Sequence, residues 1–323
     1  MGSEEEREGV RLTNLDQELF PDAGCTKRVL VDYLDRLADR MIGYLRDRPL
    51  SVIRVLRGQP PFMQKNLAKY TPDWVPRMTT WAESAHREVT YALGNDRRTL
   101  LWFGNQRAVE YHPALFLAQC PERPTHLVMD IDPPEGAPFG TAVAAARLVR
   151  QALSDAGLEG AVKTSGAKGV HIFVPLADAG TEQVAAASRA VAARAERLDP
   201  SLATTEFIRE DRGGKVFLDS TRAGGATVVS PYSPRLRPGV PVSFPQRWDD
   251  LDDVVPADFT VHTAPALLGD ADPWTELMPE PQPLPDELVD EGRTIPIARV
   301  RAMHEGKRRK RAAQRATRTE PEA

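Results

Sequence analysis

The segment HLVMDIDPPEG, residues 126 to 136, constrains the fold more strongly than any other part of the chain. Its apolar residues are partly β-branched, the run is too short for a helix and it ends at two prolines, so it predicts a buried strand. Because side chains alternate along a strand, Asp130 and Asp132 should point to the same face, roughly 6.6 to 7 Å apart along the chain. The two carboxylates can therefore share a ligand.

Two ionised carboxylates at the end of an apolar strand are costly unless a cation compensates them. Hard oxygen ligands suit Mg²⁺ or Mn²⁺, so one interpretation of Asp130 and Asp132 is a divalent metal site. The alternative is a strand-end turn in which one aspartate caps backbone amides and the other is solvated. This segment alone leaves both interpretations open.

A third acidic residue repeats the pattern, because Asp219 ends the apolar run GKVFLD. Three carboxylates at strand ends can hold two divalent ions about 3.5 to 4 Å apart. Such a pair of ions activates a hydroxyl nucleophile and neutralises a triphosphate during in-line displacement. Aspartate is also common at strand ends for purely structural reasons. Its co-occurrence with other motifs therefore decides between metal binding and a structural role.

A glycine-rich turn lies between two predicted strands in KTSGAKGVHIFVPL. Ser165, Gly166 and Gly169 surround Lys168, and His171 lies two residues into the second strand. Glycines let backbone amides approach an anion, and the lysine adds positive charge, so the turn suits a phosphate. The order of residues matches neither a P-loop nor a dinucleotide fingerprint, and a flexible hairpin turn is the alternative.

The segment SPYSPRLRPG places Arg235 and Arg237 two residues apart. In an extended segment both guanidinium groups face the same way, where they can bind phosphate oxygens. Surface arginines are common, so this pair gains weight only beside the acidic residues and the glycine turn.

The other patterns predict an α+β fold with a mixed or antiparallel sheet rather than a doubly wound sheet. TKRVLVDYLDRLADRMIGYL predicts one amphipathic helix with Thr26 as its N-cap. Further helices are expected for GTAVAAARLVRQALSDAG, which ends at Gly157, for residues 181–198 and near residues 294–315. Strands are predicted for LSVIRVL, TLLWF, AVKTS, GVHIFVPL, TTEFIRE, KVFLD and ATVVS.

Composition sets limits on location and partners. The 323 residues, 41% of them hydrophobic, can bury a sizeable core as one large or two intimate domains. No apolar run approaches the roughly 20 residues that span a bilayer, and the acidic start differs from a signal peptide, so we expect a cytoplasmic protein without a membrane partner.

Cys25 and Cys120 are too few and too far apart for a zinc site or a disulfide framework. The net charge is −4, but a basic stretch from Lys307 to Arg318 fits either nucleic-acid contact or a solvated helical end.

Taken in order, LTNLDQELFPDAGCTK, FMQKN, PDWV, MDIDP, KTSGAKGVHIFVPL, GKVFLD and PYSPRLRPGVPVS resemble the polymerase domain of bacterial DNA-repair ligase D, a branch of the archaeo-eukaryotic primase superfamily. The similarity runs from about residue 11 to residue 251. It implies a primase-like core and a nucleotidyltransferase that uses two divalent ions, Mn²⁺ or Mg²⁺. The family extends a DNA 3′ end with nucleoside triphosphates (NTP or dNTP), often ribonucleotides, at gaps or broken ends.

The resemblance also implies roles for individual residues. The metal-binding and catalytic residues would be Asp130, Asp132 and Asp219. The residues around the incoming nucleotide would be His112 near the sugar, and Ser165, Lys168, His171, Arg235 and Arg237 at the triphosphate. The DNA-binding residues would be Phe62 and Lys65 at the template strand and Lys27 at the 5′-phosphate across a gap.

The chain departs from the family pattern at several positions. Gln17 stands where a second lysine for the 5′-phosphate is usual, and Arg222 stands where a glutamine is common. The loop REDRGGK is less basic than expected for aligning two broken ends. We expect a stand-alone relative without a fused ligase or nuclease domain, such as a ligase C-associated primase-polymerase. It would fill short gaps in repair at the nucleoid with a separate DNA ligase.

The expected organisation is an acidic flexible start (residues 1–10), a primase-polymerase catalytic domain (11–285) and a basic C-terminal helix or tail (286–323). The alternatives within the polymerase class are an end-joining polymerase and a primer-synthesising primase. Outside that class they are a metal-dependent nuclease, which also needs clustered acidic residues, and a non-catalytic DNA-end adaptor.

Overall fold

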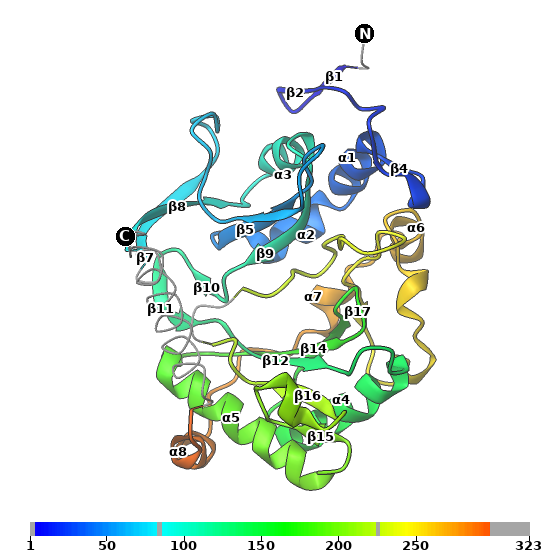
Figure 1. Ribbon diagram of the computed structural model, residues 1–323. Coiled ribbons are helices and arrows are strands. Elements are labelled where there is room, and N and C mark those ends of the chain that lie inside the picture. Colours follow the sequence, from blue (N-terminus) through cyan, green and yellow to red (C-terminus); the bar gives the residue numbers. More distant parts are fainter. Residues whose placement is uncertain (1–3, 83–85, 224–226, 298–323) are drawn as a thin grey trace, which may run out of the picture.

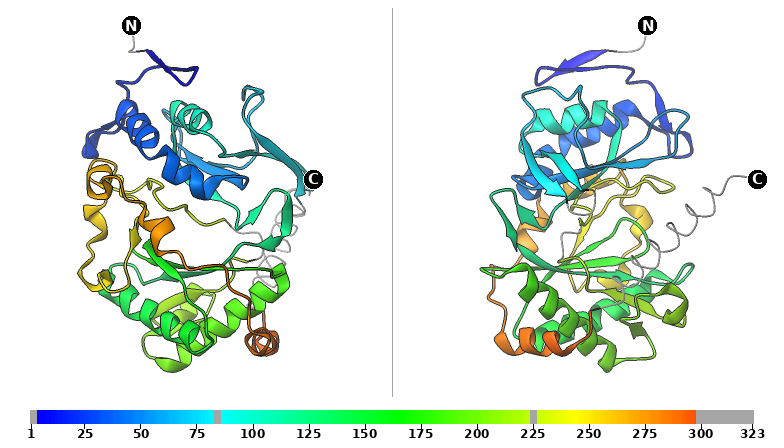
Figure 2. Two further views of the ribbon diagram at one scale, coloured as in Figure 1. Left: turned by 180° about the vertical axis from the view of Figure 1, so that it is seen from behind. Right: turned by 60° about the vertical axis from the view of Figure 1, so that its left-hand side comes forward.

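The computed structural model describes residues 4–82, 86–223 and 227–297. Figure 1 shows two stacked halves, with the first third of the chain above and a second sheet with its two long helices below. The segment that follows residue 227 runs between and beside the two halves, as both views in Figure 2 show. The chain thus returns to the first half after building the second.

The first described residues form a hairpin in which strand β1 (Glu5–Arg7) pairs antiparallel with β2 (Val10–Leu12). Arg7 donates to Asp32 of helix α1 (Lys27–Arg36) at 2.6 Å. Val10 and Leu12 are buried in the core. The prediction of a flexible acidic start is therefore wrong from residue 5 onward, because ion pairs and apolar burial fix this segment to the first helix.

The predicted single helix from Thr26 is two helices. Two short strands, β3 (Glu18–Phe20) and β4 (Cys25–Thr26), lead into α1, and α2 (Ala38–Leu45) follows it. Thr26 caps α1 as predicted, because its side chain accepts a hydrogen bond from the Val29 amide. Leu37 separates the helices with φ −98° and ψ 8°. The apolar period continues across this bend, so periodicity alone predicts one helix.

The first sheet is antiparallel. Strand β5 (Pro49–Arg54) pairs with β6 (Phe62–Gln64), β8 (Arg87–Leu93) and β9 (Ala108–Pro113), and β7 (Arg77–Ala82) pairs with β8. The strand predicted for TLLWF is wrong: the segment lies in helix α3 (Arg97–Asn105), which Asp96 caps. Leu100 to Phe103 are all buried. A helix buried on several sides has a continuous apolar run that cannot be told from a strand by periodicity.

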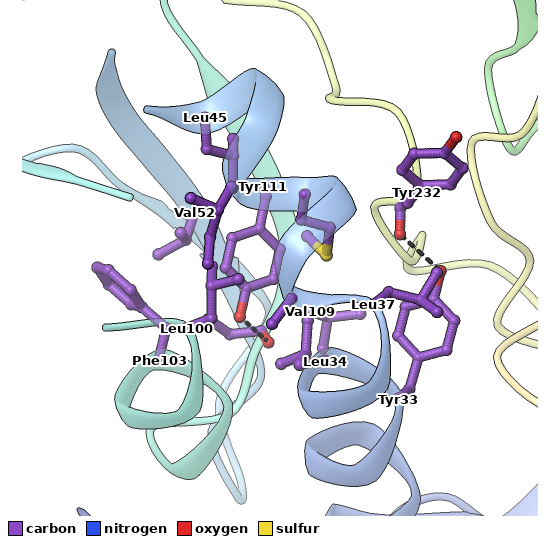
Figure 3. Close-up of a cluster of buried hydrophobic side chains, with 14 of the residues drawn as sticks. Tyr33, Leu34, Leu37, Leu45, Val52, Leu100, Phe103, Val109, Tyr111 and Tyr232 are labelled. Carbon is purple, nitrogen blue, oxygen red and sulfur yellow. Dashed lines mark hydrogen bonds between the residues drawn. The ribbon is translucent and has the colours of Figure 1, made fainter. Parts of the chain in front are cut away.

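Figure 3 shows the core of the first half, where side chains of α1, α2 and α3 pack together with those of β5 and β9. The Tyr33 hydroxyl donates to the Tyr232 carbonyl at 2.7 Å, which ties α1 to the returning segment. The same core continues to Val128 and Phe173 of the second sheet. The two halves therefore share buried apolar contacts.

The second sheet has six strands in the order β15-β16-β12-β14-β13-β17. Its strands are β12 (His126–Asp132), β13 (Ala161–Thr164), β14 (Val170–Pro175), β15 (Ala203–Thr204), β16 (Val216–Asp219) and β17 (Pro245–Gln246). All pairs are antiparallel except β15 with β16. The predicted α+β class with a mixed sheet is confirmed. A separate hairpin joins β10 (Phe116–Leu117) to β11 (Cys120–Pro124).

Two predicted strands in this half are largely wrong. Only Ala203–Thr204 of the region around TTEFIRE is a strand, and Arg209–Arg212 form a 3-10 turn instead. In the described part of ATVVS, Thr227 makes a single bridge to Ala114. Phe207 and Arg212 in the first segment line the site described below, and in the second segment the Ser230 amide donates to the Tyr111 carbonyl at 2.9 Å.

Helices α4 (Phe139–Ser154) and α5 (Thr181–Leu198) cover the face of the second sheet that points away from the first half (Figure 1). Leu127, Met129 and Ile131 lie in the core on this helical side. Because residues of a strand alternate, Asp130 and Asp132 lie on the opposite face, toward the first half. The alternation along β12 thus places the acidic residues between the two halves.

The C-terminal part contains three short helices, α6 (Ala264–Leu268), α7 (Pro273–Leu277) and α8 (Asp286–Thr294). Helix α8 packs against α5, where Gly292 approaches the Ala186 carbonyl so closely that a Cβ would lie 1.8 Å from it. Residues 286–294 therefore pack with the second half of the molecule. Most of the predicted helix 294–315, and the whole basic stretch from Lys307 to Arg318, lie outside the described residues. Among the described residues, no helix has both the length and the apolar character needed to cross a bilayer.

Candidate active site

Asp130 and Asp219 are direct cross-strand partners on β12 and β16. Residues directly opposite each other in an antiparallel pair project to the same face, with their Cβ atoms about 4.5 to 5.5 Å apart. The Arg222 guanidinium lies between the two carboxylates, with Nη2 2.6 Å from Asp130 Oδ2 and 2.8 Å from Asp219 Oδ2. Residues 89 positions apart thus form one acidic site, as the sequence pattern predicts.

Asp132 lies two residues further along the same face of β12. The Lys168 Nζ lies 3.2 Å from its Oδ1, and the Arg212 Nη1 lies 3.5 Å from its Oδ2. Arg212 also stacks on Phe217, 3.8 Å from the ring centroid, and so is held in place over β16. Each of the three carboxylates therefore faces a cationic side chain of the chain itself.

The glycine-rich turn is fixed tightly against its neighbours. The Ser165 Oγ accepts hydrogen bonds from the amides of Ala167 and Gly169. Gly166 has φ +68°, and a Cβ there would lie 2.5 Å from Arg235 Cγ. A Cβ on Gly169 would lie 2.3 Å from a backbone carbonyl oxygen of β12. Glycine at both positions is therefore required for the turn to reach the acidic strand and the arginine.

His171 links the acidic site to a buried lysine. Its Nε2 lies 3.3 Å from Asp130 Oδ1, and its Nδ1 lies 2.8 Å from the Nζ of Lys163, which is fully buried. Burial and then Lys163 lower the pKa of His171 to about 4, so the imidazole is neutral at pH 7. Lys163 Nζ also donates to Ser243 Oγ at 2.6 Å, and that hydroxyl donates to the Thr164 carbonyl. Lys163 therefore donates to Nδ1, which leaves the proton of His171 on Nε2, facing Asp130.

Arg222 is the permanent positive charge beside Asp130 at neutral pH. Burial alone would raise the pKa of Asp130, but His171 and Arg222 lower it below its usual range. Because His171 is itself neutral at pH 7, the guanidinium of Arg222 is the group that compensates the carboxylate there. Asp130 is therefore ionised at every physiological pH.

Glu110 is a functional candidate that the sequence analysis missed. It is buried on β9, with Oε2 2.8 Å from His112 Nε2 and 3.2 Å from Arg235 Nε, while Oε1 accepts the Leu236 amide at 2.7 Å. Burial works against ionisation, but His112, Arg235 and the Leu236 amide lower the pKa of Glu110 to about 2. The sequence feature that could have identified Glu110 is its position two residues before His112 in EYHP. In a strand, this spacing places both side chains on one face.

A cleft of about 820 Å³ opens over these groups. The predicted site residues that line it are Asp130, Asp132, Ser165, Lys168, His171, Asp219, Arg235 and Arg237. Arg212 and Arg222 line it as well. His112 is not among its lining residues but is joined to Arg235 through Glu110. The structure thus brings the predicted acidic and phosphate-binding groups together around one space.

The predicted DNA-binding residues lie in the first half, away from the lining of the cleft. Phe62 and Lys65 are exposed on and next to β6, and the Arg54 guanidinium lies 5.9 Å from the Phe62 ring centroid. Lys27 begins α1 and is buried, and its Nζ donates to the Thr13 carbonyl at 2.6 Å. None of the three lines the cleft, and their contact with DNA stays a prediction.

Arg107 lies beside Lys27 and is a second cation that the sequence analysis did not identify. Burial and then the charge of Arg107 lower the pKa of Lys27 to about 8. The Arg107 Nη1 lies 3.5 Å from the Gln17 side-chain oxygen. Within the described part of the chain, neither Lys27 nor Arg107 has a carboxylate within ion-pair distance. Two adjacent cations without a counter-charge are suited to an anion.

The acidic site suits divalent cations by the chemistry of its donors, because three carboxylates from two adjacent strands face one space. The position of Arg222 between Asp130 and Asp219 shows that a positive charge is accommodated there. As they stand, no three metal-ligating side chains among the described residues are close enough to enclose an ion. Rotation of carboxylates and arginines would be needed to form the coordination shell.

The two-layered fold and this arrangement of carboxylates, glycine turn and arginines define a domain of the primase-polymerase class. The family described as "LigD, primase-polymerase domain" matches residues 26–274, and the chain belongs to this family. The resemblance that the sequence motifs indicated is therefore confirmed.

Similar proteins agree with this assignment. The chain is 37% identical over 267 residues to the "Multifunctional non-homologous end joining protein LigD" of Mycobacterium bovis, covering 78% of this chain and 34% of that protein. It is 32% identical over 260 residues to the "Bifunctional non-homologous end joining protein LigD" of Bacillus subtilis, covering 79% of this chain and 41% of that protein. The chain thus spans about a third to two fifths of the length of these relatives.

A solved structure shares the fold. The "Polymerase Domain from Mycobacterium tuberculosis Ligase D in complex with DNA" superimposes with a TM-score of 0.77 at 33% sequence identity. The match covers 83% of this chain and 97% of that one. The expected primase-like catalytic core is therefore confirmed.

Proposed function

We propose that this chain is a DNA nucleotidyltransferase that adds nucleotides from NTP or dNTP to a DNA 3′ end, filling short gaps during repair. The observation that carries the proposal is the cross-strand pair of Asp130 and Asp219, which shares one cleft with the glycine turn and Arg235. Membership of the LigD primase-polymerase family supports the same activity. The DNA complex of the similar mycobacterial domain supports a DNA partner.

Asp130, Asp132 and Asp219 would hold two divalent ions, Mg²⁺ or Mn²⁺. When bound, such ions lower the pKa of the primer hydroxyl and neutralise charge on the triphosphate and the departing pyrophosphate. The protein's own part is to place these carboxylates, and at Asp130 His171 and Arg222 hold the pKa of the carboxyl below its usual range. No side chain is then required as a general base.

The triphosphate would lie along the glycine turn and the arginines. Beside the turn of Ser165, Lys168 and Arg237 offer cationic donors at the cleft. His171 would lie beside the triphosphate with its Nε2 toward Asp130, and its neutral imidazole adds no charge there. Glu110 holds Arg235 and His112 in fixed orientations, which lets His112 approach the nucleotide sugar.

The DNA contacts would be made by the first half. Lys27 and Arg107 would grip the 5′-phosphate of the downstream strand, so that Arg107 supplies the charge that Gln17 does not. Phe62 would stack on a template base without sequence preference, and Lys65 would contact the backbone. Affinity should fall with salt because most contacts are to phosphates. A separate DNA ligase would seal the product.

The test is extension of a primer across a short 5′-phosphorylated gap by the wild-type chain and by Asp219→Ala. The wild type should extend the primer, and Asp219→Ala should lose extension while still binding gapped DNA. Asp178→Ala removes an exposed carboxylate that pairs with Arg123 and is the matched control. Extension retained by Asp219→Ala refutes the proposal. Strand loss by the wild type without added nucleotide indicates a nuclease, and DNA binding without extension indicates a non-catalytic adaptor.

A further inference from the structure

The Arg222 side chain contacts the two carboxylate oxygens of the acidic site that face each other, one from Asp130 and one from Asp219. Asp219 Oδ1 accepts hydrogen bonds from the Thr221 amide and hydroxyl, so Oδ2 is the oxygen that it turns toward the site. Asp130 likewise uses Oδ1 for His171 and Oδ2 for Arg222. A single nitrogen, Nη2 of Arg222, lies within 2.8 Å of both facing oxygens. The guanidinium therefore contacts carboxylate oxygens that would hold a divalent ion.

The contact differs from a stable structural arginine pair. Arginine and carboxylate usually form two parallel hydrogen bonds in a fork, which satisfies several donors at once. Here Nη2 serves both carboxylates, and the buried Nε of Arg222 has no hydrogen-bond partner among the described residues. An unpaired buried donor is costly. Electrostatic attraction, rather than a pair of parallel hydrogen bonds, thus stabilises this arrangement.

Charge explains why the guanidinium stays there. Two like charges directly opposite each other in an antiparallel pair destabilise the sheet. His171 lies at Asp130 Oδ1 rather than at the facing oxygen, and Lys163 contacts the other side of His171 rather than either carboxylate. Lys168 and Arg212 lie at Asp132. Among the described residues, Arg222 is therefore the cation that compensates both Asp130 and Asp219.

We propose that Arg222 is a resident counter-cation that a divalent metal ion must displace, and that the nucleotide triphosphate makes this exchange favourable. The inference rests on the proposed function. A metal ion and a guanidinium cannot share the same two facing oxygens, so the side chain must rotate out when the ion enters. Its side chain is 29% exposed and lines the same cleft as the glycine turn, so the displaced guanidinium has a triphosphate within the cleft as its new partner.

The consequence is coupling between metal and nucleotide. Without nucleotide, the metal must compete with Arg222 for Asp130 and Asp219. With nucleotide bound, the guanidinium has another anion to contact, and the competition weakens. Because coupling between two ligands is reciprocal, the metal also raises nucleotide affinity by the same factor. Arg222 thus compensates the negative charge of the acidic site until both the metal ion and the nucleotide are bound.

The test is the Mn²⁺ affinity of the full chain, measured by calorimetry and by Mn²⁺ electron paramagnetic resonance, with and without a non-hydrolysable nucleoside triphosphate. In the wild type, the nucleotide should tighten Mn²⁺ binding about tenfold or more. Arg222→Gln should bind Mn²⁺ about tenfold tighter than the wild type without nucleotide, and should show a smaller nucleotide effect. Arg123→Gln removes one exposed positive charge that pairs with Asp178, and it should leave Mn²⁺ affinity unchanged.

Arg222→Lys covers the case in which the glutamine variant does not fold. It keeps a positive charge near the acidic residues but is shorter and unforked, so its Mn²⁺ affinity should lie between those of Arg222→Gln and the wild type. Mn²⁺ binding no tighter in either variant than in the wild type overturns the inference but leaves the proposed function standing. Mn²⁺ binding by the wild type that is unaffected by Asp130→Asn, with or without nucleotide, overturns both.

Discussion

Glu110 is expected to position the nucleotide side of the cleft without touching the nucleotide. Its carboxylate lies between His112 and Arg235 and also accepts the Leu236 amide. In Glu110→Gln the remaining side-chain oxygen can still accept the hydrogen bond from the Leu236 amide. The other position becomes an NH₂ group that meets donors on His112 and Arg235, so Arg235 loses its anionic partner while the volume stays almost the same.

The size of the effect follows from the burial of Glu110, which is 4% exposed. Hydrogen bonds to charged groups contribute about 1.5 to 3 kcal/mol each. If one such contact at the nucleotide is lost through misplacement of Arg235, affinity falls by roughly 10- to 100-fold at about 1.4 kcal/mol per factor of ten. The variant should therefore raise the KM for nucleotide by about this factor, with a smaller fall in kcat.

The assay is steady-state primer extension with nucleotide titration, together with thermal unfolding of the same preparations. Glu182→Gln removes the same charge from an exposed pair with Arg293 and should change neither parameter, because such surface pairs contribute about 1 kcal/mol or less. A lower Tm for Glu110→Gln with an unchanged nucleotide KM would refute a positioning role, since it would show that Glu110 serves stability alone.

Further predictions concern the DNA grip and the glycine turn. Lys27→Ala and Arg107→Ala should each weaken binding to 5′-phosphorylated gaps but not to unphosphorylated ones in a fluorescence anisotropy titration; equal losses on both would contradict the assignment. Because a phosphate binds the protonated amine and the pKa of Lys27 is about 8, the wild-type preference for phosphorylated gaps should decline as pH rises from 7 to 9, and a preference that is constant or rising would count against it. Gly169→Ala should lower the free energy of unfolding by about 2 to 3 kcal/mol in urea titrations, because its Cβ would meet a β12 carbonyl at 2.3 Å. Gly140→Ala in α4, where a Cβ meets nothing within 4 Å, should be neutral or slightly stabilising, and similar losses in both variants would refute the steric explanation.

The sequence predicts most of the acidic site because strands impose a strict alternation. The apolar period of HLVMDID fixes which face of β12 is buried, and the aspartates then have to lie on the other face. Asp219 could be recognised as part of the same pattern, although only the sheet order shows that it pairs directly with Asp130. The roles of the remaining site residues are predictions from the family resemblance.

The errors arise where tertiary contacts override a local pattern. TLLWF has the composition of a strand but is a helix buried among other elements. The acidic start looks unstructured but is fixed by Arg7 to α1. Glu110 and Arg107 lie beside residues that are distant in sequence, Arg235 and Lys27 respectively, so no local pattern reveals them. Arg222 was visible only as an unusual residue, and its contact with both aspartates required the structure.

The most direct measurement of the central claim is anomalous scattering from Mn²⁺ in crystals grown with a gapped DNA and a non-hydrolysable nucleoside triphosphate. The account predicts two anomalous peaks, one of them between Asp130 and Asp219, with the triphosphate along the Ser165 turn and Arg222 turned away from the carboxylates. Anomalous peaks only elsewhere on the molecule, with Arg222 still bridging Asp130 and Asp219 beside bound nucleotide, would contradict it.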